Sequence, residues 1–322
     1  MSAAAVHGHV ADGYAEVAEA FAATLVDTDR CGAALSVWQD GQEVVDVWAG
    51  TADGRTGRPW TQHTPAIAFS ASKSVAALVV AMLVQDGEVS YDQPVAEIWP
   101  EFAVHGKGSV TVGDLLAHRA GLSAPPGPLD REVVLDSRAW AETIAQQEPL
   151  WDPGTAHAYH ALTLGPLVAE IVRRVTGTEL ADVVRERVAT PLDAATTFAP
   201  TAGAVTTASG LARILSAVVT PTRGVHLLDG ETVAAVCRPR SSGHWAFPAP
   251  PGPYPVWGAG MQVVSEVLPG LSPSSFGHGG AGGQVALADP ERRTGMAYVR
   301  NRMDSEGPGP GLTAALRAKI RS

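Results

Sequence analysis

Residues 70–87 read SASKSVAALVVAMLVQDG, a short polar segment that leads into a long apolar one. The run from Val75 to Val84 would carry apolar side chains on nearly every face of a helix, which indicates a helix buried on all sides. Gly87 closes this helix, because glycine readily takes the left-handed conformation found after many helix ends. We therefore predict a buried helix over 70–86, with Ser70 and Lys73 in its first turn.

Ser70 and Lys73 form a Ser-x-x-Lys pair, and residues three apart share one face of a helix. A lysine can lose its proton when it is desolvated, whereas an arginine stays charged. The chain has only three lysines, Lys73, Lys107 and Lys319, while arginine is common. The positive potential of a helix N-terminus would also favour an alkoxide on Ser70. The pair predicts a serine nucleophile activated by a lysine, and a helix-surface lysine is the alternative.

Two further segments carry candidate groups. Tyr159 lies in Tyr159-His160-Ala161, and a buried tyrosine near a lysine can share its proton and act as a general base. The alternative is a core tyrosine with a satisfied hydroxyl. Residues 276–283 read FGHGGAGG just before a predicted strand. Glycines there let a ligand approach the backbone, whose N–H groups can bind an oxyanion, and a plain glycine-rich turn is the alternative.

Composition excludes several classes of function. The formal charge of −10 argues against a nucleic-acid partner, and no apolar stretch is long enough to span a membrane. The first ten residues lack the pattern of a secretory signal, so we expect a cytoplasmic protein with Cys31 and Cys237 as free thiols. Neither the cysteines nor the histidines have metal-ligand spacing, so we expect no metal and no cofactor.

The order of predicted elements indicates an α+β fold. Helical and strand periodicities place an opening helix and hairpin before a helical middle, and strands with a last helix at the end. The predicted helices are 10–27, 137–147, 162–176, 179–189, 207–219 and 311–321. The predicted strands are 33–38, 43–48, 257–264, 284–289 and 295–300. We predict an antiparallel sheet built from both chain ends, formed by residues 1–69 with 257–322 and flanked by helices. Residues 70–256 form a mostly helical region, and the active site lies at the junction.

Taken in order, these motifs resemble the serine β-lactamase and penicillin-binding-protein superfamily. The likeness is greatest to class C β-lactamase-like esterases, called family VIII carboxylesterases. Residues 111–122, TVGDLLAHRAGL, and residues 151–155, WDPGT, belong to the same resemblance. It covers nearly the whole chain and implies the β-lactamase-like α/β sandwich.

The resemblance also implies a role for each site residue. Ser70 would be the acylated nucleophile, and Lys73 and Tyr159 would take its proton and later activate water. The backbone N–H groups of Ser70 and Ala281 would bind the oxyanion. The substrate-binding positions that the resemblance implies are His278, Gly279, Gly280 and Ala161.

Three of these positions depart from the β-lactamase pattern. His278 and Gly279 stand where many β-lactamases have the lysine and threonine that help to hold the substrate carboxylate. Ala161 stands where many have an asparagine that contacts the substrate amide. The departures favour an esterase over an efficient β-lactamase.

We therefore expect a serine hydrolase that cleaves small carboxylic esters through a Ser70 acyl-enzyme. An acyltransferase or an amide or β-lactam hydrolase on the same machinery is one alternative, because transfer needs only an acceptor that outcompetes water. A non-catalytic binding protein of the same fold is another. The expected partner is a small-molecule ester or amide.

Overall fold

The computed structural model describes residues 5–127, 132, 135–199, 203–248, 254–264, 270–303 and 309–320. Among these residues, no helix combines the length and the apolar character needed to cross a bilayer.

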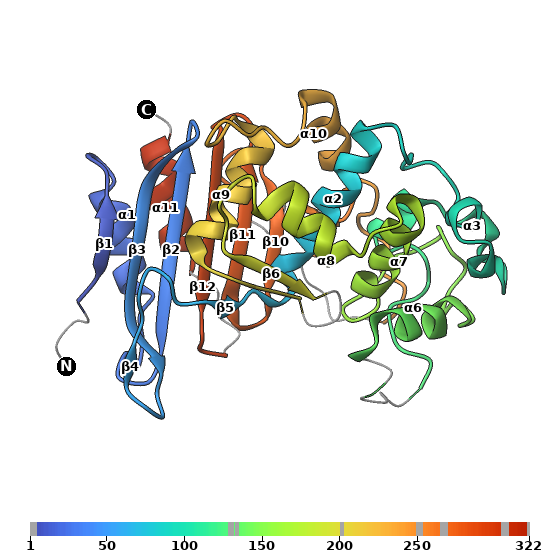
Figure 1. The fold of residues 1–322 in the computed structure, drawn as a ribbon, viewed down its shortest axis with the longest axis horizontal. Coiled ribbons are helices and arrows are strands. Elements are labelled where there is room, and N and C mark those ends of the chain that lie inside the picture. The colour runs from blue at the N-terminus through green and yellow to red at the C-terminus, as the bar shows by residue number, and fades with distance from the viewer. Residues whose placement is uncertain are drawn as a thin grey trace.

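An antiparallel sheet of nine strands runs through the described part of the chain (Figure 1). Its main path has the order β1-β3-β2-β12-β11-β10-β9-β8, and β4 pairs with β3 beside this path. The strands are β1 (His7–Val10), β2 (Gly32–Gln39), β3 (Gln42–Asp53), β4 (Arg58–Pro59), β8 (Val256–Trp257), β9 (Gln262–Val263), β10 (Phe276–Gly280), β11 (Gln284–Asp289) and β12 (Thr294–Arg300).

The centre of this sheet joins the two ends of the chain. Strand β2 pairs with β12 in a register that sets Ala34 opposite Val299 and Val37 opposite Met296. In Figure 1 these strands lie side by side in blue and red, the colours of the two chain ends. The predicted sheet from both chain ends is therefore confirmed.

Helices cover both faces of the sheet (Figure 1). On one face, α1 (Ala15–Ala23) and α11 (Gly309–Ile320) bury Phe21 and Leu316 against Leu35 and Tyr298. On the other face lies α9 (Ala208–Val219), which approaches β12 very closely. A Cβ at Gly295 would sit 2.2 Å from the backbone nitrogen of Ser216, so only glycine fits under this helix.

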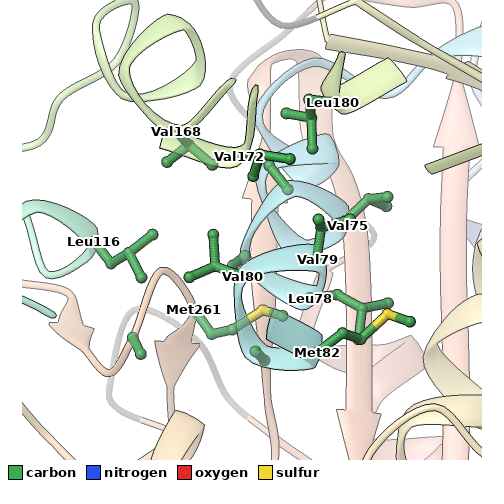
Figure 2. Packing of buried hydrophobic residues seen from close by; sticks show 14 of the residues in the cluster. Val75, Leu78, Val79, Val80, Met82, Leu116, Val168, Val172, Leu180 and Met261 are labelled. Carbon is green, nitrogen blue, oxygen red and sulfur yellow. The ribbon is translucent and has the colours of Figure 1, made fainter. Parts of the chain in front are cut away.

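The remaining helices form a second layer of packing around α2 (Lys73–Gln85). Figure 2 shows Val75, Val79 and Val80 of α2 among Leu116, Val168, Val172, Leu180 and Met261 from surrounding elements. The side chains from Ser74 to Leu83 are all buried, as expected for a helix that is apolar on nearly every face. Helices α7 (Leu164–Thr176), α8 (Leu180–Val183) and α10 (Gly230–Cys237) contact α2. Helices α3 (Val95–Ile98), α4 (Val112–Leu116) and α6 (Ser137–Ala145) pack on α7.

The structure also contains strands that the sequence did not indicate. A small sheet has the order β5-β7-β6, formed by Ala66–Ile67, Gly203–Thr206 and Thr196–Ala199. The predicted elements leave residues 190–206 unassigned, between the ranges 179–189 and 207–219. Strand β5 ends three residues before Ser70. It pairs with β7, which lies more than a hundred residues later in the sequence. This small sheet therefore holds the approach to the predicted nucleophile.

The predicted division of the chain into 1–69 with 257–322 and 70–256 stays a prediction. Helix α9, in the second of these ranges, lies on the sheet formed by the first. The buried cluster around α2 also includes Trp38 and Phe276 of the sheet. The two regions therefore share one continuous apolar interior.

Candidate active site

Ser70 lies in a short 3-10 turn, η1 (Phe69–Ser72), that runs without interruption into α2. The predicted helix over 70–86 thus begins as a tighter turn. Phe69, just before Ser70, has φ 46°, in the left-handed region that side chains other than glycine rarely adopt. Such strain persists only where the surroundings impose it. Here the backbone N–H of Ala68 donates to the carbonyl of Ala204 in β7 at 2.8 Å, which fixes the chain just before the turn.

Lys73 places its ammonium group beside the Ser70 hydroxyl. Its Nζ lies 3.3 Å from Ser70 Oγ and donates to the backbone carbonyl of Ala161 at 2.8 Å. Burial lowers the pKa of Lys73 to about 8, because the charged form loses hydration. The predicted pairing of Ser70 with Lys73 across one turn is present, and Ala161 contributes to it through its backbone.

The ring of Tyr159 lies over Lys73, with Nζ 5.2 Å from the ring centroid. Burial raises the pKa of Tyr159 to about 12, an effect that the nearby Ser70 hydroxyl partly opposes. No described residue forms a hydrogen bond of normal geometry with the Tyr159 hydroxyl, so Ser70 and Tyr159 are neighbours rather than a bonded pair. The same burial thus lowers the pKa of the amine and raises that of the phenol.

Trp257 and His118 fix the plane of the Tyr159 ring. Trp257 stacks on it with ring centroids 5.4 Å apart and an interplanar angle of 4°. His118 meets it edge-on at 5.0 Å. Both lie far from Tyr159 in sequence, and neither was among the predicted site residues. The signal available was limited to the TVGDLLAHRAGL segment, which contains His118.

His160 and His118 are neutral imidazoles that order the chain behind Tyr159. His118 Nδ1 accepts the backbone N–H of His160 at 3.2 Å, and His160 Nε2 accepts that of Leu122 at 3.1 Å. Burial lowers the pKa of His160 to about 4 and that of His118 well below its usual range. These histidines therefore support the site without adding charge to it.

The glycine-rich segment is strand β10 and the turn after it. Gly279 donates its backbone N–H to Gln262 Oε1 at 3.1 Å. A Cβ at Gly280 would sit 2.6 Å from the carbonyl oxygen of Ala68 and 3.2 Å from the backbone nitrogen of Ala71. The end of β10 therefore lies directly against the turn that carries Ser70. Ala281 follows at the start of η5 (Ala281–Gly283) and is exposed.

His278 is buried beside the stacked rings of Tyr159 and Trp257, with ring centroids 5.8 Å and 5.3 Å away. Its Nδ1 is hydrogen-bonded to the carbonyl oxygen of Gly279. Burial, reinforced by the charge of Lys73, lowers the pKa of His278 to about 3. The side chain is therefore neutral at neutral pH, and the position offers no cation to a substrate.

The site contains a serine, a lysine, a tyrosine and neutral rings, and the described residues include no cluster of three or more metal-ligating side chains. The predicted residues Ser70, Lys73, Tyr159 and His278 lie together where β10, η1 and α2 meet. This arrangement can activate a serine hydroxyl without a carboxylate or a metal.

Comparison with known proteins shows the family of this chain. Residues 17–319 match the Beta-lactamase family. The chain belongs to the beta-lactamase family. Within this family, it is 31% identical over 360 residues to the esterase/beta-lactamase LipL of Mycobacterium tuberculosis, an alignment that covers 90% of this chain and 81% of LipL.

Solved structures of the beta-lactamase family have the same fold. A family VIII carboxylesterase is 27% identical with a TM-score of 0.89, covering 98% of this chain and 99% of that one. EstA from Arthrobacter nitroguajacolicus Rue61a is 29% identical with a TM-score of 0.87, covering 97% and 98%. A penicillin-binding protein homologue from Caulobacter crescentus is 30% identical with a TM-score of 0.89, covering 97% and 98%. The predicted family and fold are confirmed, whereas the roles of individual site residues stay predictions.

Proposed function

We propose that this hydrolase of the beta-lactamase and esterase family cleaves small, uncharged carboxylic esters through a Ser70 acyl-enzyme. The observation that carries the proposal is the position of Lys73. Its amine lies 3.3 Å from Ser70 Oγ, it is held by the Ala161 carbonyl, and burial lowers its pKa to about 8. A lysine that can lose its proton so close to a serine hydroxyl is suited to act as its general base.

The first half of the reaction forms the acyl-enzyme. Neutral Lys73 takes the proton of Ser70 while Oγ attacks the ester carbonyl carbon. The backbone N–H groups of Ser70 and Ala281 stabilise the negative oxygen of the tetrahedral intermediate. As the carbonyl re-forms, the C–O bond to the alcohol breaks. The leaving alkoxide takes a proton from the Lys73 ammonium or from Tyr159, whose raised pKa keeps it protonated.

The second half releases the acid. Once the alcohol has taken its proton, Lys73 is again the neutral member of the Lys73 and Tyr159 pair, and water gives it a proton while attacking the acyl carbonyl. The tetrahedral intermediate then collapses, the bond between the acyl carbon and Ser70 Oγ breaks, and Ser70 recovers its proton. The products are one alcohol and one carboxylic acid, so atoms and charge balance with water as the second substrate.

The neutral state of His278 supports uncharged substrates. A buried imidazole whose pKa is about 3 provides no positive charge for the carboxylate of a β-lactam. The exposed Ala161 side chain likewise offers no amide to the substrate. We therefore propose ester cleavage as the main activity and only weak β-lactam hydrolysis.

The decisive experiment is intact-protein mass spectrometry after incubation with a fluorophosphonate, which labels activated serines. We expect one adduct on the wild type and none on Ser70→Ala, whose kcat on p-nitrophenyl butyrate should fall by roughly 10⁴-fold or more. Ser74→Ala is the matched control, because Ser74 is buried in the same helix and its hydroxyl has no partner among the described residues. It should be labelled like the wild type.

Two outcomes would contradict the proposal. An adduct that persists on Ser70→Ala would mean that another residue is the nucleophile. No adduct on folded wild-type protein would favour the non-catalytic binding protein, the alternative that the sequence left open.

A further inference from the structure

The turn that would supply the Ala281 N–H has no side chain of its own that could fix its conformation. After β10 the chain passes through Ala281, Gly282 and Gly283, and both glycines are left-handed, with φ 76° and 84°. Alanine and glycine have no polar side chain to fix such a turn. The orientation of the proposed oxyanion donor therefore depends on groups outside the turn.

One of these groups is Arg300, the last residue of β12. Its side-chain Nε donates a hydrogen bond to the carbonyl oxygen of Gly282. Arg300 is only 6% exposed, so its guanidinium acts from inside the protein. A guanidinium stays charged at every accessible pH and presents its N–H groups in a rigid plane, which makes it a strong donor to a carbonyl.

Gln284 fixes the backbone of Arg300 in turn. Val285 of β11 lies opposite Tyr298 of β12. Continuing this antiparallel register by two residues would set Arg300 opposite Gly283, but Gly283 belongs to the turn and not to β11. The buried amide of Gln284 replaces that partner: its Nε2 donates to the Arg300 carbonyl at 2.7 Å, and its Oε1 accepts the Arg300 N–H at 2.9 Å. The arginine is therefore anchored at the level of the turn.

On the other side, the residue just before the turn packs against the backbone of Ala68 and Ala71, which flank Ser70. Gly280 lies against the backbone around Ser70, where no side chain would fit. A turn clamped between η1 and Arg300 has its Gly282 carbonyl directed to the arginine. The two contacts together restrict the turn whose first residue is Ala281.

We propose that Arg300 is a positioning residue, which holds the 281–283 turn so that the backbone N–H of Ala281 can bind the oxyanion. The inference rests on the proposed function, because it assigns a support to the oxyanion site of that reaction. It predicts that Arg300 affects the transition state much more than it affects substrate binding.

The test compares Arg300→Met with Arg292→Met. Arg292 is the matched control, because it also donates to a backbone carbonyl, that of Ile320, but from the turn between β11 and β12, at the other end of β12. For each variant we would measure kcat and KM on p-nitrophenyl butyrate, the melting temperature, and the Ki of phenylboronic acid. The boronate forms a tetrahedral adduct with an activated serine and so reports on the oxyanion site.

For Arg300→Met we expect kcat to fall by roughly tenfold or more with KM nearly unchanged, a smaller effect than the 10²- to 10³-fold of deleting an oxyanion donor. The Ki of the boronate should rise by a similar factor. Arg300→Lys, which keeps the charge but loses the planar group, should recover only part of the loss. Arg292→Met should lower the melting temperature without changing kcat or Ki.

The inference is wrong if folded Arg300→Met keeps wild-type kcat, or if kcat falls while the Ki of the boronate stays the same. Should Arg300→Met fail to fold, Arg300→Lys with unchanged kcat and Ki overturns it equally. A wild type that shows neither labelling nor esterase activity removes the proposed function, and this inference with it. An active wild type with unaffected Arg300 variants removes this inference alone.

Discussion

Lys73 and Tyr159 respond to the same burial in opposite directions. Desolvation disfavours the charged form of each group, so it lowers the pKa of the amine to about 8 and raises that of the phenol to about 12. Between these values the lysine is neutral and the tyrosine is protonated. The pair then holds one proton acceptor and one proton donor, which is the combination that acyl transfer needs.

This gives a prediction for the pH dependence of the reaction. The base form of Lys73 increases as pH rises through about 8, so kcat/KM for an uncharged ester should rise with pH up to that value and then level off. Lys73→Arg should lose activity by roughly 10²-fold or more, since arginine does not release its proton. Stopped-flow or plate assays from pH 6 to about 10 would measure the profile.

Lys107 provides the control for this profile. It is also buried with its pKa lowered to about 8, and it donates to the carbonyls of Val104 and Gln147, apart from the candidate site. Lys107→Met should destabilise the fold but keep the same pH profile. A profile that is flat around pH 8, or that changes in Lys107→Met, would show that Lys73 does not control the rate.

Strand β10 and the η1 turn come closest at Gly280. The end of β10 lies so close to the Ser70 turn that Gly280 cannot carry a side chain without moving one of them. Gly279, one residue earlier on the same strand, has nothing nearer than 3.9 Å to the position of an added Cβ. Adjacent glycines therefore differ in whether the contact requires them.

We predict that Gly280→Ala lowers the free energy of unfolding by about 1–3 kcal/mol, the usual effect of inserting atoms into a packed contact. It should also slow fluorophosphonate labelling, because the oxyanion strand and the Ser70 turn are pushed apart. Gly279→Ala should unfold at nearly the wild-type urea concentration. Equal stability of the two variants would contradict the close contact at Gly280.

Elements with a clear period could be predicted from the sequence. The predicted helix 162–176 is α7, ended by Gly177 with φ 72°, and the predicted strand 284–289 coincides with β11. The predicted helix 10–27 is shorter in the structure, where α1 spans Ala15–Ala23, and Val10 belongs instead to strand β1, which pairs with β3. Local pattern cannot reveal such pairing, since the partner lies more than thirty residues away.

Some residues of the candidate site could likewise be predicted from the sequence, and others could not. Ser70 and Lys73 are one turn apart, so helical geometry alone predicts their contact. Tyr159 and the glycine-rich segment that contains His278 were already candidates from their residues, and the resemblance to a known family implied a role for each. Trp257, His118 and Arg300 reach the site or its supports only through the tertiary fold, and His118 alone of the three lies in a segment, TVGDLLAHRAGL, that the sequence singled out.

At the scale of the whole molecule, the apolar interior does not stop at the predicted boundary between regions. The cluster around α2 continues through α9 to Ala286 and Ala297 on the sheet. Neither region can expose its side of this cluster without losing the burial that stabilises both. Long chains often unfold in steps, but a shared interior opposes this.

We therefore predict one cooperative unfolding transition for the whole chain. Calorimetric and van't Hoff enthalpies should agree, and the near-UV circular dichroism and the loss of Ser70 labelling should follow the same temperature curve. Two resolved transitions, or labelling lost well before the dichroism, would mean that the helical region melts independently of the sheet.

The pairing of β2 with β12 also has a consequence for protein synthesis. From Gln39 to Thr294 the ribosome must add 255 residues before the central strand pair can form. At about 5–20 residues per second, this takes roughly 13–50 s. During that interval the β2–β3 hairpin has an open edge that its final neighbour does not yet cover, and open edges are where chains aggregate. Completion of this sheet therefore waits for β12, which is synthesised long after β2 and β3.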